Sequence, residues 1–132
     1  MYLLDTNICI YYLKGLYNLD QKIRSVNEKN CFISELTVAE LKFGVENSSE
    51  ENRESNRQKV DHLINLFQIL PINTCFDIYA KEKTRLKKSG NIISEFDLLI
   101  GCTSISYNMI MVTKNIKHFE KIENIKLENW AE

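Results

Sequence analysis

Four short segments of the chain each place one oxygen-bearing side chain at the edge of an apolar run. The four side chains belong to Asp5 after Leu3-Leu4, Glu40 within Thr37–Leu41, Asp97 before Leu98–Gly101, and Asn115 after Val112-Thr113. Ends of strands and starts of helices are where open α/β sheets bind ligands. Three carboxylates gathered at one such edge would repel one another unless a hard cation held them. The pattern therefore indicates divalent-metal chemistry.

Each of these residues also has a structural explanation. Thr37-x-x-Glu40 and Ser94-x-x-Asp97 match the helix capping box, and Asp5 is suited to cap a helix that begins directly after it. Asn115 suits a turn. Capping does not exclude metal binding, because the positive end of a helix dipole lowers the cost of crowding several acids together.

The elements that must position these side chains alternate between strands and helices. Strands are predicted at Met1–Leu4, Cys31–Ser34, Phe67–Ile72, Met109–Val112 and Ile125–Leu127. Helices are predicted at Asn7–Leu13, Leu19–Val26, Thr37–Val45, Thr74–Lys88 and Phe96–Tyr107. A further amphipathic helix carries Val60, Leu63, Ile64 and Phe67 at i, i+3, i+4 and i+7. The polar stretch Asn47–Asn56 is either a loop or a solvated helix start, and Pro71 favours a sheet edge.

Such alternation predicts βαβ units, that is, a mostly parallel sheet of four to five strands covered on both faces. The 132 residues form one domain over 1–132 with 44% apolar residues and a formal net charge of −1, so any contact with nucleic acid must come from a local patch. No apolar run approaches the roughly 20 residues of a membrane helix. The start has no basic leader, and the four scattered cysteines are expected to be free and buried. We expect a cytoplasmic protein with no membrane contact.

The four segments together resemble the signature segments of PIN-domain ribonucleases, most closely the VapC-type toxins of bacterial type II toxin–antitoxin systems. The resemblance extends to Val112-Thr113-x-Asn115-x-x-His118-Phe119 and covers essentially the whole chain. It implies a three-layer α/β/α sandwich and an endoribonuclease that depends on Mg²⁺ or Mn²⁺. It also implies a homodimer, with higher-order assembly on a cognate antitoxin that occupies the active-site groove.

Carried over residue by residue, the resemblance puts Asp5, Glu40 and Asp97 at the acidic metal positions. Asn115 falls where many relatives have aspartate, and an amide oxygen adds no negative charge. We therefore expect one tightly held Mg²⁺, with a second ion arriving only with substrate phosphate. Thr6 and Thr113 are expected to orient Asp5 and the water at the metal.

The expected chemistry is attack of a metal-activated water on the phosphodiester, with Glu40 or Asp97 accepting the proton. Neither histidine is well placed by sequence to act as a general base. His62 lies on a polar helix face, and His118 is expected to pack or cap beside Phe119.

Basic and apolar residues outside the acidic segments predict contacts with RNA and protein. Lys81, Arg85 and Lys88 share one helix face, and Lys114 and Lys117 flank Asn115, so all five are candidates for phosphate contacts. A solvated helix face explains the first three equally well. Tyr11 and Tyr12 suit base stacking, an antitoxin groove or core packing. Together with Leu13 and the Val60–Phe67 stripe, they predict surface buried by a second copy or an antitoxin helix.

Two other functional classes stay open. A haloacid-dehalogenase-like phosphatase also begins with a strand that ends in aspartate, but its acid/base aspartate two residues later is Asn7 here. A non-catalytic binding module with the PIN fold is the second alternative, and Asn115 keeps it open.

Overall fold

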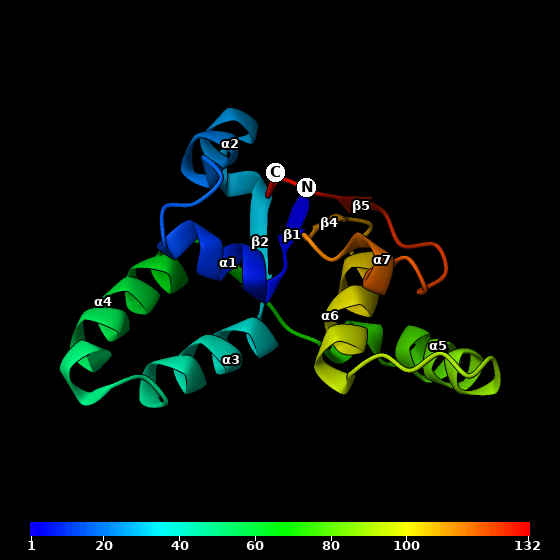
Figure 1. The fold of residues 1–132 in the computed structure, drawn as a ribbon. Helices are drawn as coiled ribbons and strands as arrows, with labels where there is room; N and C mark the ends of the chain where they lie inside the picture. The colour runs from blue at the N-terminus through cyan, green and yellow to red at the C-terminus, as the bar shows by residue number, and fades with distance from the viewer.

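A parallel five-stranded sheet lies between two layers of helices in the computed structural model, which describes residues 1–132 (Figure 1). The strands follow the spatial order β3 (Gln68–Leu70), β2 (Cys31–Ser34), β1 (Tyr2–Leu4), β4 (Ile110–Val112) and β5 (Leu127–Glu128). All neighbouring pairs are parallel. The predicted α/β sandwich is confirmed, and the strand before Pro71 lies at the sheet edge as expected.

Four helices cover one face of the sheet and three cover the other (Figure 1). The first layer consists of α1 (Thr6–Leu13), α2 (Leu19–Val26), α3 (Glu35–Glu46) and α4 (Glu50–Leu66). The second consists of α5 (Phe76–Lys88), α6 (Glu95–Ser106) and the short α7 (Ile116–Phe119). Two 3₁₀ turns, η1 (Glu28–Asn30) and η2 (Asn73–Cys75), precede β2 and α5. None of the helices is both long and apolar enough to cross a membrane.

Two hydrophobic cores result because successive strand residues point to opposite faces of the sheet. Leu4, Ile33 and Val112 belong to the core under α1–α4, whereas their neighbours on the same strands, Leu3, Phe32 and Met111, belong to the core under α5–α7. All four cysteines are free and buried within these two cores, as expected.

Several helix starts and strand ends differ from the sequence-based boundaries, whereas the Asn47–Asn56 stretch agrees with one of the two expectations for it. α3 begins at Glu35 because the Ser34 hydroxyl accepts a hydrogen bond from the Leu36 amide at 3.1 Å, so the capping box proposed for Thr37-x-x-Glu40 is wrong. Most of the Asn47–Asn56 stretch is the solvated first part of α4. The last strand is Leu127–Glu128, two residues later than its predicted start at Ile125.

The amphipathic stripe on α4 is core and not an interface. Val60, Leu63 and Phe67 are buried under the first layer, and Tyr12 packs edge-on against Phe67 with ring centroids 6.0 Å apart. Leu63 and Phe67 are therefore not available to a partner, whereas Val60 also borders a surface groove between α1, α3 and α4. The exposed large apolar side chains are elsewhere, at Phe43, Phe76, Ile92 and Phe96 among others.

The order in which strands are added to the sheet reverses between β1 and β4, although all strands stay parallel. From β1 the chain builds outward to β2 and β3, and it then returns through α5 and α6 to add β4 on the other side of β1. A crevice forms where connections leave neighbouring strands in opposite directions, and ligands bind there in open α/β sheets. Asp5 and Thr113 directly follow these two strands.

Candidate active site

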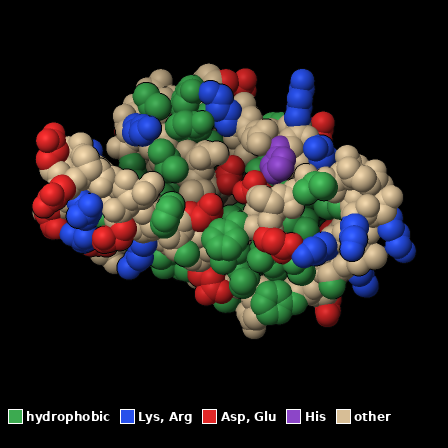
Figure 2. All heavy atoms as spheres, turned by 60° about the horizontal axis from the view of Figure 1, so that its bottom comes forward, with side chains coloured by type: hydrophobic (Ala, Val, Ile, Leu, Met, Phe, Trp, Pro, Cys, Tyr) green, Lys and Arg blue, Asp and Glu red, His purple; other side chains and the backbone are tan.

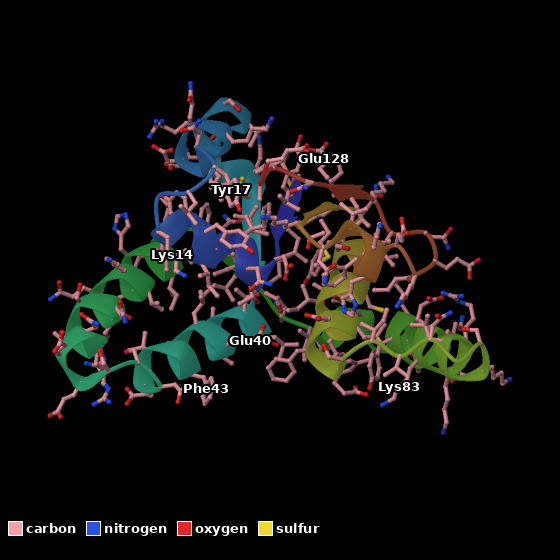
Figure 3. The ribbon with its side chains drawn as sticks, in the orientation of Figure 1. Lys14, Tyr17, Glu40, Phe43, Lys83 and Glu128 are labelled. Carbon is pink, nitrogen blue, oxygen red and sulfur yellow. The ribbon has the colours of Figure 1, made fainter.

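Acidic side chains gather at the carboxyl ends of the strands, around the reversal point between β1 and β4. Figure 2 looks onto this end of the molecule and shows acidic groups at the centre of the face, with a histidine beside them and hydrophobic side chains around. In Figure 3, Glu40 on α3 points into the space between the two helical layers. Elements that are distant in sequence therefore contribute to one site.

Asp5 is the buried member of this group, with a relative exposure of 4%. Its Oδ2 accepts a 2.8 Å hydrogen bond from Thr113 Oγ1, and its backbone amide donates to the Val112 carbonyl at 2.9 Å. The pKa of Asp5 is raised to about 6, mainly by burial; the hydrogen bond from Thr113 lowers it, and the charges of Asp97 and Glu40 add to the rise. The raised pKa indicates a carboxyl group that a cation would stabilise in its ionised form.

Glu40 is held by two threonine hydroxyls in series. Thr6 Oγ1 donates to Glu40 Oε1 at 2.7 Å and lies 2.9 Å from the buried Thr37 Oγ1. Because a hydroxyl has one proton and an ionised carboxylate only accepts, Thr37 donates to Thr6. Thr6 therefore orients Glu40 and not Asp5, which corrects the role expected for it. Thr113 contacts Asp5 as predicted.

Asp97 in the first turn of α6 contacts a histidine from the last part of the chain. Its Oδ2 lies 3.1 Å from His118 Nε2 on α7, and the Nε2–H tautomer of the imidazole donates to it. Ser94 precedes α6 but makes no side-chain capping hydrogen bond. His118 also packs edge-on against Phe119, with ring centroids 5.1 Å apart, so the expected packing is confirmed while the contact with Asp97 was not foreseen.

Asn115 lines a hollow of about 270 Å³ together with Asp5, Asn7, Tyr11 and Lys114. Its side chain is exposed and caps no helix, whereas its backbone amide donates to Thr113 Oγ1 at 3.0 Å. Thr113 thus fixes Asp5 and the backbone of Asn115 at once. The amide side chain remains available to a ligand in the hollow.

Comparison with known proteins identifies the architecture. A family model described as "PIN domain" matches residues 2–125. The chain belongs to the PIN-domain family. The haloacid-dehalogenase-like alternative therefore does not hold.

Relatives of this PIN domain are named as ribonucleases. "Ribonuclease VapC2" of Rickettsia felis is 36% identical, with 98% of each chain covered. "tRNA(fMet)-specific endonuclease VapC" of Salmonella typhimurium is 30% identical, again over 98% of each chain. The resemblance to VapC-type proteins is confirmed, and nucleases of this type are generally dependent on divalent metal.

Solved structures with the same fold include two VapBC structures bound to DNA. VapBC2 from Rickettsia felis, bound to a promoter DNA fragment, superimposes with a TM-score of 0.86 at 36% identity, covering 98% of both chains. DNA-bound VapBC from Salmonella typhimurium gives a TM-score of 0.90 at 26% identity, covering 98% of this chain and 97% of that one.

The basic residues that the sequence predicts to contact RNA differ in how free their side chains are to do so. Arg85 is not free to bind RNA, because its guanidinium already binds groups of the same chain. It donates to Glu82 and to the Lys121 carbonyl at 2.7 Å, and it lies 3.3 Å from the Glu123 carboxylate. Lys81, Lys88 and Lys117 are exposed. Lys114 donates to the Tyr17 hydroxyl at 2.6 Å, and this hydrogen bond raises the pKa of the ammonium.

Three contributors to the site were missed or misjudged from the sequence. Thr37 had been assigned a capping role, His118 a packing role, and Tyr17 no role at all. The spacing of His118 three residues after Asn115 was a weak signal. Tyr17 had no sequence signal, because its position depends on the conformation of the α1–α2 connection.

Proposed function

We propose that the chain is a divalent-metal-dependent endoribonuclease that acts as the toxin of a VapC-type toxin–antitoxin pair. The observation that carries this proposal is the meeting of Asp5, Glu40 and Asp97 at the reversal point of a PIN-domain sheet. The names of its relatives as VapC ribonucleases support the same reaction class.

The donor set fits Mg²⁺, with Mn²⁺ as a substitute. No three acidic, histidine or cysteine side chains converge closely enough to close a coordination sphere among themselves. Mg²⁺ does not require that, because it binds through one or two carboxylates, several waters and substrate phosphate. Asp5 and Asp97 would hold it with Glu40, and the exposed amide of Asn115 would face its hydration shell.

The side chains around the acids prepare the site for hydrolysis. Thr113 fixes the rotamer of Asp5, the Thr37–Thr6 pair fixes Glu40, and His118 fixes Asp97. When bound, the ion supplies Lewis acidity to the phosphodiester and makes the attacking water more acidic. Glu40 or Asp97 accepts the proton from that water, whichever is less engaged with the ion.

Substitution of the acids tests the reaction. Asp5→Asn and Asp97→Asn should each abolish cleavage of RNA and toxicity in cells while the fold persists, because each removes a charge from the site and not from the core. Asp61→Asn on exposed α4 is the matched control and should retain activity. Sequencing of RNA ends after expression gives the readout. Wild-type cleavage by either site variant contradicts the assignment, and no cleavage by the wild type leaves the binding-module alternative.

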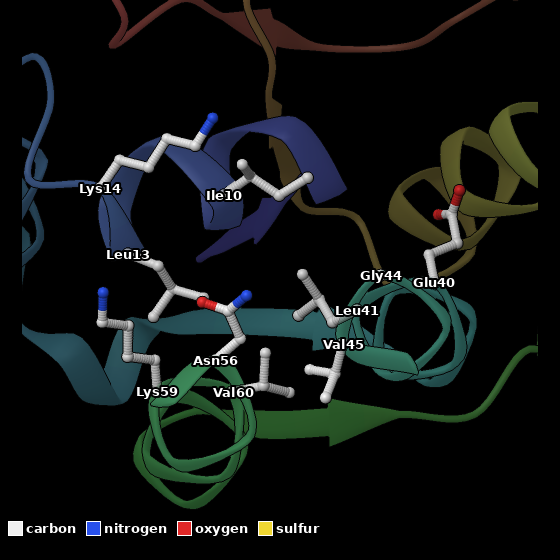
Figure 4. Close-up of a pocket in the computed structure, with 10 residues that line it drawn as sticks. All are labelled: Ile10, Leu13, Lys14, Glu40, Leu41, Gly44, Val45, Asn56, Lys59 and Val60. Carbon is white, nitrogen blue, oxygen red and sulfur yellow. The ribbon is translucent and has the colours of Figure 1, made fainter. Parts of the chain in front are cut away.

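We further propose that an antitoxin helix neutralises the chain by lying in the groove between α1, α3 and α4 (Figure 4). Ile10, Leu13, Leu41, Val45 and Val60 form the apolar part of this groove, and Lys14 and Lys59 border it. Glu40 belongs both to the groove and to the acidic site. A cationic side chain from an antitoxin in the groove would therefore reach the acids and compete with metal.

A homodimer is also part of the proposal. The exposed side chains of Phe76, Ile92 and Phe96, and not the α4 stripe, are the apolar surface available to a second copy. Light scattering across micromolar concentrations tests this, and a strict monomer contradicts it.

The RNA substrate would also be held by Lys81, Lys88, Lys114 and Lys117. We place this activity in the cytoplasm, where thiols such as the four free cysteines stay reduced.

A further inference from the structure

Beside the acidic site lies a cluster of Tyr11, Tyr17 and Lys114, of which only Lys114 has been given a role above, as one of several RNA contacts. Tyr11 comes from α1, Tyr17 from the α1–α2 connection (labelled in Figure 3), and Lys114 from the segment after β4. The Lys114 ammonium lies 4.6 Å from the centre of the Tyr17 ring and 5.6 Å from that of Tyr11. The two rings meet edge to face, with centroids 5.3 Å apart.

The backbone around Tyr17 is unusual. Tyr17 and Asn18 both adopt left-handed conformations, with φ of 60° and 52°. Asparagine tolerates this region, but for an aromatic residue it is unfavourable. The conformation turns Tyr17 back so that its hydroxyl accepts a 2.6 Å hydrogen bond from Lys114. Strain of this kind persists where neighbouring contacts demand it, and it is concentrated at functional sites.

The cluster also borders the catalytic hollow directly. Tyr11 and Lys114 line that hollow with Asp5, Asn7 and Asn115, and Lys114 is the one cationic residue among them. At ~30 Å³ per water, its volume of about 270 Å³ holds roughly nine waters. That is room for a phosphate and a hydrated ion, and the tyrosine rings at the border of the hollow offer a surface on which a nucleobase can lie.

We propose that Tyr11, Tyr17 and Lys114 form a nucleotide subsite that holds the RNA phosphate one linkage away from the scissile bond and stacks the base beside it. This inference rests on the ribonuclease function proposed above. Lys114 has three donors, of which Tyr17 takes one, so the others can reach a phosphate oxygen without breaking the cluster. Only an unpaired base can leave its stack to lie on a tyrosine ring, so the subsite selects single-stranded RNA.

Binding measurements test the subsite separately from turnover. On an Asp97→Asn background, fluorescence anisotropy with a single-stranded RNA oligonucleotide should show about fivefold to tenfold weaker binding for Lys114→Gln. The slope of log affinity against log salt should fall by about 0.7, the value for one phosphate contact on a single strand. Lys114→Arg should restore both. Lys29→Gln, which removes the same charge beside the opposite ends of the strands, should change neither.

Kinetics on the active protein provide a second measurement. Lys114→Gln should raise KM for a longer RNA with little change in kcat, and the rise in KM should be smaller for a dinucleotide, which lacks the neighbouring phosphate. Tyr17→Gly should weaken RNA binding severalfold while the melting temperature stays equal or rises, because glycine accepts the left-handed backbone. Lower RNA affinity only in parallel with lost stability overturns the subsite in favour of a structural role.

The outcomes also distinguish a failure of the proposed subsite from a failure of the proposed ribonuclease function. An unchanged salt slope and KM for Lys114→Gln in a protein that cleaves RNA overturns the subsite alone. A wild type that cleaves no RNA with Mg²⁺ or Mn²⁺ overturns the ribonuclease function, and the anisotropy measurement then decides the subsite independently. Duplex RNA that competes as well as single-stranded RNA overturns the proposed selectivity.

Discussion

At the scale of single residues, the Asp5 carboxyl carries an electrostatic cost in the metal-free protein. Its pKa of about 6 lies above the ordinary 3.8, mainly because the group is buried. Below pH 4 the carboxyl is protonated in both the folded and the unfolded chain. Between about pH 4 and pH 6 the unfolded chain releases this proton while the folded chain keeps it, so stability falls by about 3 kcal/mol in total over that range.

Asp5→Asn should therefore stabilise the metal-free protein at neutral pH but not in acid. We expect an increase in the free energy of unfolding of up to about 3 kcal/mol at pH 7 and a small change at pH 4. Urea unfolding in the presence of EDTA measures both values. Asp61→Asn, on the exposed surface, should show little effect at either pH. A gain for Asp5→Asn that is equal at both pH values contradicts the explanation.

His118 acts through Asp97 in this structure, so its substitution should affect activity more than folding. His118→Ala should lower RNA cleavage by about 10–100-fold, the usual effect of losing a residue that orients a metal ligand. His118→Gln keeps a donor on a shorter side chain and should recover part of the loss. Cleavage rates measured against Mn²⁺ concentration distinguish weaker metal binding from slower chemistry. Equal activity of both variants and the wild type excludes a positioning role.

The identity of the acids could be predicted from the sequence, but the partners of the acids could not. Asp5, Glu40 and Asp97 stand out because each lies at the edge of an apolar run, and because the four segments occur in the order of the PIN-domain signature, which helix capping does not explain. The hydrogen bonds from Thr6 to Glu40 and from His118 to Asp97 depend on how α3 and α7 approach their neighbours. Those approaches are set by core packing, which no local pattern encodes.

At the scale of elements, Gly101 lets α6 lie close to the segment that follows α7. A Cβ at this position would lie 2.6 Å from the Cδ1 of Ile122, a residue that is almost fully buried. Gly44 on α3 is also a helical glycine, but an added Cβ would meet nothing within 4 Å. The glycine of the Asp97–Gly101 segment therefore serves packing behind the site.

Alanine at the two helical glycines should consequently have opposite effects. Gly101→Ala should destabilise the fold by about 1–2 kcal/mol, because the buried Ile122 must shift. Gly44→Ala should stabilise it by about 0.5–1 kcal/mol, since alanine is the better helix former and has space. Chemical denaturation of the two variants beside the wild type gives the comparison. Stabilisation by Gly101→Ala shows that α6 can move away without cost.

The order and type of the elements could be predicted, while several of their ends could not. Alternating apolar runs and helical stripes indicated the five strands and six of the seven helices, and the short α7 was not predicted. The start of α3 was misplaced because Ser34 and Thr37 are both acceptable caps, and the hydrogen bond from the Leu36 amide to the Ser34 hydroxyl decides between them. The α4 stripe was read as an interface because the sequence does not reveal how much apolar surface α1–α3 cover.

At the scale of the whole molecule, the acidic site joins the two helical layers. Asp5 and Glu40 come from the side of α1 and α3, whereas Asp97 and His118 come from α6 and α7. A ligand shared by these residues binds only the folded chain. It therefore stabilises the entire domain by mass action.

Divalent metal should raise the melting temperature of the wild type. At a metal concentration about 100 times the Kd, the gain in stability should be about 2.7 kcal/mol. Thermal unfolding with Mn²⁺ and with EDTA measures it. Asp5→Asn should lose most of this shift, and Asp61→Asn should retain it. The same shift in Asp5→Asn as in the wild type indicates that the ion binds elsewhere.

The hydrogen bond from Thr113 to Asp5 joins residues 108 positions apart, and this separation has a consequence for synthesis. A ribosome that adds 5–20 residues per second needs roughly 5–20 s to pass from the first of these residues to the second. Throughout that interval the growing chain lacks β4 and the threonine that fixes Asp5. The site of a nascent copy therefore stays incomplete until β4 and Thr113 have been synthesised.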